Sequence, residues 1–160
     1  MNVTTPAAAP DSARELRLTR DVSASPEQIF RAWQTRLADW WAPQPFTTPI
    51  CEVDLRPGGA LRTVMRSPDG SEFVCGGVFL EVVPNRRIVF TDAFGPGWKP
   101  NPDIFFTAIV TFDPLPEDRT RYTARALHWT AAARQRHEEM GFHQGWGQCL
   151  EQLVAVAREL

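Results

Sequence analysis

Lysine is scarce in this sequence, and long apolar runs are missing. Lys99 is the single lysine among 17 basic residues, and 19 acidic residues bring the formal net charge to −2. A chain with this balance has no basic field to hold a polyanion, which excludes nucleic acid as the main partner. No stretch approaches the roughly 18 apolar residues of a membrane span, and no basic segment followed by an apolar one marks a signal peptide at the N-terminus. We therefore expect a cytoplasmic protein without a membrane span.

Cysteine is scarce as well. Cys51, Cys75 and Cys149 make an odd number, and no two of them have the C-x-x-C spacing. This pattern indicates neither a disulfide framework nor a zinc knuckle. The expectation is three buried free thiols in a reducing compartment.

Sequence motifs of familiar enzymes are absent. The chain has neither the H-E-x-x-H helix of zinc proteases nor the G-x-S-x-G turn of serine hydrolases. His137-Glu138-Glu139 lacks a second histidine four residues away, so His128, His137 and His143 do not predict a metal site. From the sequence we assign no catalytic residue, no metal ligand and no cofactor.

The length of 160 residues suits one domain with its own core. Residues 1–14 are rich in Ala, Pro, Thr and Ser and have no apolar periodicity, which predicts a disordered tail. The remaining residues, 15–160, are interpreted as a single domain. Leu16 and Leu18 alternate with polar residues, as in a half-buried first strand.

Helix signals follow this strand at once. Ser25 can cap a helix, Pro26 suits its first position, and Gln28 stands where a capping box needs its third residue. The apolar face continues to Trp41 in a second short helix, which Pro43 ends.

The apolar pattern then changes to a period of two, which is typical of strands. Short connections such as Pro68-Asp69-Gly70 predict antiparallel hairpins in a meander. The connection 95–102 is longer and contains Trp98, and a lid is one interpretation of it. The predicted strands are residues 50–55, 60–66, 73–83, 87–94, 104–113 and 120–128.

The last segment, about residues 131–159, predicts one long helix capped by Thr130. Its apolar face would carry Met140, His143, Trp146, Leu150, Leu153 and Ala157. Three glycines inside it each cost up to about 1 kcal/mol against alanine. They indicate either a bend or a close approach to the helix backbone, and they are Gly141, Gly145 and Gly147.

Aromatic side chains are abundant, with six Trp and ten Phe. They form either an ordinary core or the wall of a pocket with a few polar groups inside. Strand parity supplies those polar groups, because alternate residues share a face. It places Glu81 with Phe79, Asp92 with Phe90, and His128 on the concave side of the sheet.

An ordered series of motifs resembles a known family. It runs through Ser25-Pro26-Glu27, Trp40-Trp41-Ala42-Pro43, Asp54-Leu55-Arg56-Pro57-Gly58-Gly59, Pro68-Asp69-Gly70, Gly77-Val78-Phe79-Leu80-Glu81-Val82, Arg87-Ile88-Val89-Phe90-Thr91-Asp92, Met140-Gly141 and Gly145-Trp146. Together these motifs resemble the bacterial family named after the C-terminal domain of the heat-shock-protein-90 ATPase activator. That family belongs to the SRPBCC superfamily, whose members look like START lipid-binding domains and the birch pollen allergen.

The resemblance implies the α+β helix-grip fold. Its curved antiparallel sheet, of about six or seven strands, would wrap around a long C-terminal helix, with two short helices after the first strand. The implied partner is a small hydrophobic molecule held between that helix and the sheet. The expected pocket residues, by aromatic character and parity, are Trp40, Trp41, Phe46, Phe79, Glu81, Phe90, Asp92, Phe94, Trp98, Phe106, His128, Met140 and Trp146.

Two other functions stay open at this point. An enzyme of the cyclase or hydratase kind would use His128, or Glu81 with Asp92, as general acid or base on an aromatic or polyketide-type substrate. A chaperone-associated interaction module follows from the family name, although residues 1–14 are too short to replace the chaperone-binding domain that the eukaryotic co-chaperone carries. Open sheet edges are compatible with a homodimer.

Overall fold

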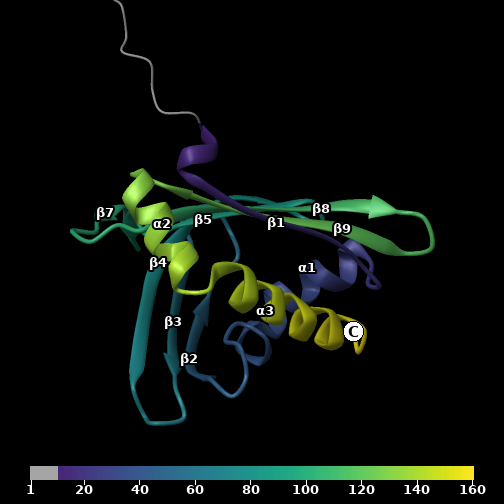
Figure 1. Cartoon of the computed structure of the whole chain (residues 1–160). Helices are drawn as coiled ribbons and strands as arrows, with labels where there is room; N and C mark the ends of the chain where they lie inside the picture. The colour runs from purple at the N-terminus through teal and green to yellow at the C-terminus, as the bar shows by residue number, and fades with distance from the viewer. Residues whose placement is uncertain (1–10) are drawn as a thin grey trace, which may run out of the picture.

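The computed structural model describes residues 11–160, which form an α+β fold (Figure 1). Its sheet has seven antiparallel strands in the order β1-β9-β8-β5-β4-β3-β2. From β2 onward, each strand of this sheet pairs with the next strand of the sheet along the chain, so that β5 pairs directly with β8. The first strand, β1, pairs with the last, β9. The strands are β1 (Glu15–Val22), β2 (Thr47–Val53), β3 (Ala60–Arg66), β4 (Glu72–Val83), β5 (Arg87–Thr91), β8 (Phe106–Leu115) and β9 (Arg119–His128).

The connection between β5 and β8 contains a small hairpin of its own, β6 (Phe94–Gly95) and β7 (Lys99–Pro100). Trp98 lies at its tip with a positive φ of 60°. The segment interpreted from sequence as a lid is therefore a short two-stranded turn.

The first helix begins as the sequence predicts. In α1 (Pro26–Thr35) the Ser25 hydroxyl accepts a hydrogen bond from the Gln28 amide, and the Gln28 side chain accepts one from the Ser25 amide. This capping box satisfies two amides that a helix start leaves without partners. A 3-10 turn, η2 (Leu37–Asp39), follows.

The predicted long C-terminal helix is present, but the segment 131–159 is divided into two helices at one of the glycines that indicated a bend. Helix α2 (Ala131–Glu139) is capped by Thr130, and α3 (Phe142–Ala157) begins after Gly141, whose φ of 92° interrupts the helix. Residues before and after this break do not share one face. Met140 and His143, which were expected on the apolar face, are exposed.

The first described residues also differ from prediction. Asp11–Ala13 form a 3-10 turn, η1, and the carbonyl of Arg14 accepts a hydrogen bond from the His128 amide. Residues 11–14 are thus joined to the domain rather than to a free tail. The rest of the predicted tail, residues 1–10, lies outside the described residues.

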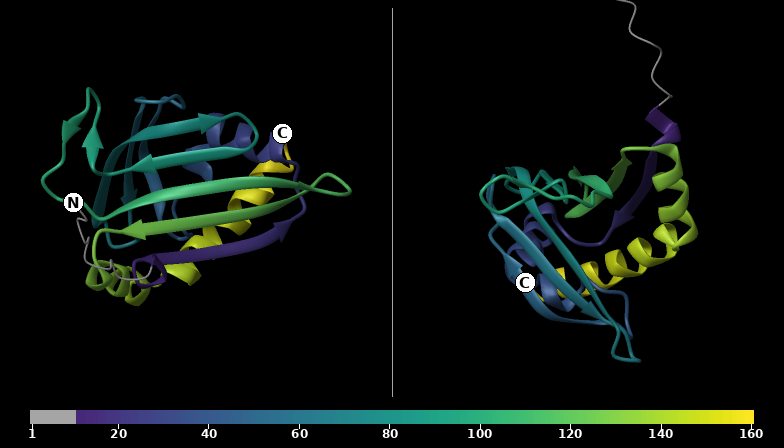
Figure 2. Two further views of the ribbon diagram at one scale, coloured as in Figure 1. Left: turned by 90° about the horizontal axis from the view of Figure 1, so that it is seen from above. Right: turned by 90° about the vertical axis from the view of Figure 1, so that its left-hand side faces the viewer.

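Helix α3 lies across the concave side of the sheet, and β2–β4 lean away from the other strands (Figure 2). Its C-terminal half packs against α1 and β1 with Leu150, Leu153 and Ala157 buried. Among residues 11–160 no helix is long and apolar enough to cross a membrane.

Candidate functional site

A continuous group of aromatic rings lies on the concave side of the sheet. Trp40 and Trp41 pack edge-on against each other, and both contact Trp33. Phe90 then contacts Trp41, with ring centroids 5.8 Å apart, and Phe106, with centroids 6.3 Å apart. Two further members are Phe79, which contacts Phe90, and Trp146, which contacts Phe106.

This ring group is closed at one end and open at the other. Trp33, Trp40 and Phe79 are buried, whereas Trp41, Phe106 and Trp146 are only partly buried. Along α3, Trp146 and Cys149 are only partly buried, whereas Phe142 at the start of the helix and Leu150 and Leu153 later in it are buried. We call the partly exposed part the open concave surface, and it is formed by Trp41, Cys51, Val53, Phe106, Trp146 and Cys149.

Helix α3 approaches this surface closely at Cys149. The Cys149 thiol donates a hydrogen bond of 3.2 Å to the Trp41 carbonyl, and burial raises its pKa to about 12. Gly145 lies one turn earlier on the same face. A Cβ atom added there would meet no atom within 4 Å. At Gly147, in contrast, the Arg20 guanidinium lies within 2.6 Å of such a Cβ atom.

Two histidines stand next to the open concave surface. His128, at the end of β9, points to the concave side as parity predicted, and it is buried. Its Nε2 lies 2.8 Å from Nδ1 of His137, on α2. The His137 ring is surrounded by other rings: its centroid lies 4.7 Å from Phe105, 5.0 Å from Phe106, 5.2 Å from Phe142 and 5.9 Å from Trp146.

The hydrogen bonds fix where the protons of this pair lie. His128 Nδ1 is 2.9 Å from the Arg14 carbonyl, which can only accept, so Nδ1 carries the proton. In the neutral ring Nε2 of His128 is then an acceptor, and Nδ1 of His137 donates to it. Burial, together with the smaller effect of nearby His128, lowers the pKa of His137 to about 4; the pKa of His128 is also lowered, chiefly by burial. Both rings are therefore neutral at pH 7.

Polar atoms without partners lie on the strands facing α3. Thr63 shares a face with the core residue Leu61, and its register partners are Cys51 on β2 and Cys75 on β4. The Thr63 hydroxyl is buried and has no partner in ordinary hydrogen-bond geometry within the described residues. The pKa of the neighbouring Cys75 thiol is raised by burial, and its interaction with this hydroxyl acts in the opposite direction. Buried polar atoms are normally paired, so such an atom requires an explanation.

Asp92 has a similar unpaired atom at the end of β5. Its Oδ2 accepts a hydrogen bond of 2.8 Å from the Phe105 amide, but Oδ1 is buried without a partner. Burial raises the pKa of this carboxyl group above its ordinary value. Asp92 was expected to lie beside Phe90, and it is half-buried at the end of the same strand.

Glu81 does not share a face with Phe79, so that prediction is wrong. A β-bulge at Leu80 shifts the register between Phe79 and Glu81, and an extra residue reverses the direction of every later side chain. Glu81 is exposed and forms an ion pair with Arg87, with Nε and Oε1 3.2 Å apart. Glu81 and Asp92 therefore do not form the acid–base pair considered above.

Four other expected pocket residues lie away from the ring group. Met140 is 69% exposed at the helix break. Phe94 and Trp98 contact each other on the β6–β7 hairpin, where Trp98 covers Gly58. Phe46 stacks on Phe73 near the free end of β3 and β4.

Seven of the expected residues do come together through chains of ring contacts. They are Trp40, Trp41, Phe79, Phe90, Phe106, His128 and Trp146. Sequence analysis missed Phe105, His137 and Phe142. No local pattern in the sequence signals that His137 contacts His128, because the contact depends on the angle between β9 and α2.

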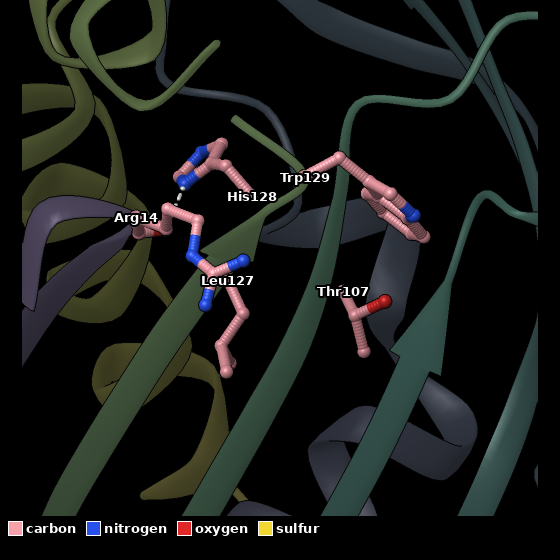
Figure 3. Close-up of a pocket in the computed structure, with 5 residues that line it drawn as sticks. All are labelled: Arg14, Thr107, Leu127, His128 and Trp129. Atoms are coloured by element: carbon pink, nitrogen blue, oxygen red, sulfur yellow. Dashed lines mark hydrogen bonds between the residues drawn. The ribbon is translucent and has the colours of Figure 1, made fainter. Parts of the chain in front are cut away.

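Two open hollows lie outside the open concave surface. One, of about 380 Å³, is lined by Arg14, Thr107, Leu127, His128 and Trp129 (Figure 3). Thr107 and Leu127 are register partners on the convex side, opposite Phe106. The other hollow, of about 450 Å³, lies between residues 38 and 49. Neither is lined by α3.

The fold defines a class of protein, the helix-grip domain of the SRPBCC superfamily. Residues 23–158 match the family model described as activator of Hsp90 ATPase homolog 1-like protein. This match extends over most of the chain, so the protein belongs to that family.

Solved structures agree with this assignment. A protein from Nitrosomonas europaea is 37% identical, with a TM-score of 0.87 over 94% of this chain and 97% of the other. A protein from Chromobacterium violaceum is 29% identical, with a TM-score of 0.71 over 89% and 96%. The AHSA1 protein from Silicibacter pomeroyi shares the fold, with 24% identity and a TM-score of 0.64 over 91% and 99%. A search of curated proteins gives no match.

Proposed function

We propose that this protein binds a small, mainly apolar molecule on the open concave surface between α3 and the sheet. One observation carries the proposal: Trp41, Phe106 and Trp146 are partly exposed although each contacts a ring of the buried core. Aromatic faces of this kind favour flat apolar partners, since such rings gain from stacked or edge-on contacts.

The polar groups near the concave side are buried. A binding surface of this type needs a few polar groups to orient its ligand. Thr63 Oγ1 and Asp92 Oδ1 are enclosed by the protein, so a ligand would reach them only if neighbouring side chains moved. We further propose that residues 15–160 bind this molecule as a single domain. We also propose that the protein is cytoplasmic.

The enzyme alternative has no comparable support. Both ring nitrogens of His128 are engaged in hydrogen bonds, and Glu81 lies on the opposite face from the rings. For a chaperone-associated role, the family description is the only support. We therefore propose neither function.

The proposal is tested with 2-naphthol as a flat aromatic probe. Titration into the wild-type chain, followed by backbone amide NMR shifts, is expected to give saturable changes at Trp41, Phe106 and Trp146. Gly145→Leu should abolish them, because a leucine one turn before Cys149 on the same helix face would compete with the probe for the proposed surface. Gln144→Leu adds the same side chain at an exposed neighbouring position and should bind normally. Absence of saturable shifts, or equal binding to both variants, contradicts the proposal.

A further inference from the structure

His128 and His137 are linked in a series of hydrogen bonds that leaves one ring nitrogen of His137 without a partner among residues 11–160. The series begins at the Arg14 carbonyl, which accepts from His128 Nδ1, and continues from His128 Nε2 to His137 Nδ1. Nε2 of His137 makes no hydrogen bond within the described part of the chain, and it is not among the fully buried polar atoms without partners. This nitrogen is therefore not completely enclosed, although the His137 side chain as a whole is buried.

The direction in which these hydrogen bonds are donated makes Nε2 of His137 a hydrogen-bond acceptor only. A carbonyl at one end forces each neutral ring to carry its proton on Nδ1, so His137 Nε2 has a lone pair and no proton. A second histidine ring usually has two tautomers, but here His128 removes that freedom. This nitrogen can accept a hydrogen bond and cannot donate one.

The surroundings of the nitrogen restrict the shape of its partner. Phe105, Phe106, Phe142 and Trp146 all have ring centroids within 5.9 Å of the His137 centroid. Phe106 and Trp146 are also members of the open concave surface. A donor that reaches His137 must consequently belong to a molecule that packs among aromatic rings.

We propose that His137 selects ligands in which an aromatic ring carries a hydroxyl or N–H group, by accepting a hydrogen bond at Nε2. This inference rests on the proposed function, because it names the chemical class of molecule that the open concave surface would take. His128 acts as a positioning residue, since it holds the His137 tautomer without touching the ligand.

The test compares 2-naphthol with 2-methoxynaphthalene, which has the same rings but no donor. A hydrogen bond of ordinary net strength corresponds to a preference of about 3- to 10-fold. The ratio of the two Kd values should therefore change by about that factor, to the disadvantage of 2-naphthol, in His137→Phe. His143→Gln, which changes an exposed histidine, should leave the ratio at its wild-type value.

The possible outcomes separate the two proposals. If both probes bind and the ratio is the same in wild type and His137→Phe, the selection by His137 is wrong while the binding function stands. If neither probe binds to the wild type, both proposals fail.

A measurement on the wild-type chain covers the case in which His137→Phe does not fold. In histidine ¹⁵N NMR spectra, 2-naphthol should shift the Nε2 resonance of His137 strongly and 2-methoxynaphthalene should not. Equal shifts with the two probes would overturn the inference.

Discussion

The two halves of α3 have different surroundings, although they belong to one helix. From Leu150 onward the inward face is closed, with Leu153 and Ala157 completely buried. Before Leu150 the helix carries Trp146 and Cys149, which are only partly buried, although Phe142 at its start is buried. The closed half is built for stability, and we interpret the open half as built for binding. Substitutions in the two halves should therefore affect different properties.

The largest expected difference is in the free energy of unfolding. Leu153→Ala should lower it by about 2–5 kcal/mol, because a cavity remains in a closed core. Cys149→Ala, in the open half, should lower it by only about 1 kcal/mol, since one hydrogen bond and little packing are lost. Urea denaturation of both variants measures the difference. Equal losses would mean that the halves are packed alike.

Acid should destabilise the fold through the histidines beside the open half. The pKa of His137 is lowered from 6.5 to about 4, so the unfolded chain binds more protons between these pH values. The free energy of unfolding should therefore fall as pH falls from 6.5 to 4, by at most about 3 kcal/mol from His137. The Arg134 guanidinium faces His128 and acts in the same direction.

The control for this pH effect is an exposed histidine. His143→Gln should keep the wild-type pH profile, whereas His137→Phe should flatten it in this pH range. Urea denaturation of the three proteins at several pH values measures the profile. A profile that does not change in His137→Phe would show that the neutral pair is not its cause.

The smallest expected effect is a difference in stability between alanine substitutions at two glycines of α3. Gly145→Ala should stabilise the chain by up to about 1 kcal/mol, because alanine favours a helix interior and its methyl group meets nothing. Gly147→Ala should gain less, since the Arg20 side chain must move away from the new methyl group and its hydrogen bond to the Gly147 carbonyl is disturbed. Thermal unfolding of both variants provides the comparison. A larger gain at Gly147 would contradict the close approach of Arg20.

The sequence predicted the sheet and α1 because their signals are local. The capping box at Ser25 and the turns between strands depend on neighbouring residues, and they specify the antiparallel order without knowledge of the core. Parity also placed His128 correctly, since β9 has no irregularity between Arg119 and His128.

The wrong predictions arise at positions where a single residue changes the direction in which all later side chains point. The bulge at Leu80 moved Glu81 to the outer face, and Gly141 divided the expected helix and left Met140 exposed. Glycine content indicated a bend or a close approach, and both occur, at Gly141 and Gly147. The His128–His137 contact depends on the angle between β9 and α2, which no local pattern encodes.

The central claim is that the open half of α3 and the facing sheet form a binding surface for a flat aromatic molecule. Intermolecular nuclear Overhauser effects from 2-naphthol test it most directly, because they locate the probe by proximity. We predict contacts to the side-chain protons of Trp41, Phe106 and Trp146, all lost in Gly145→Leu. Contacts to Trp129 in the convex hollow instead, or contacts that persist in Gly145→Leu, would contradict the account.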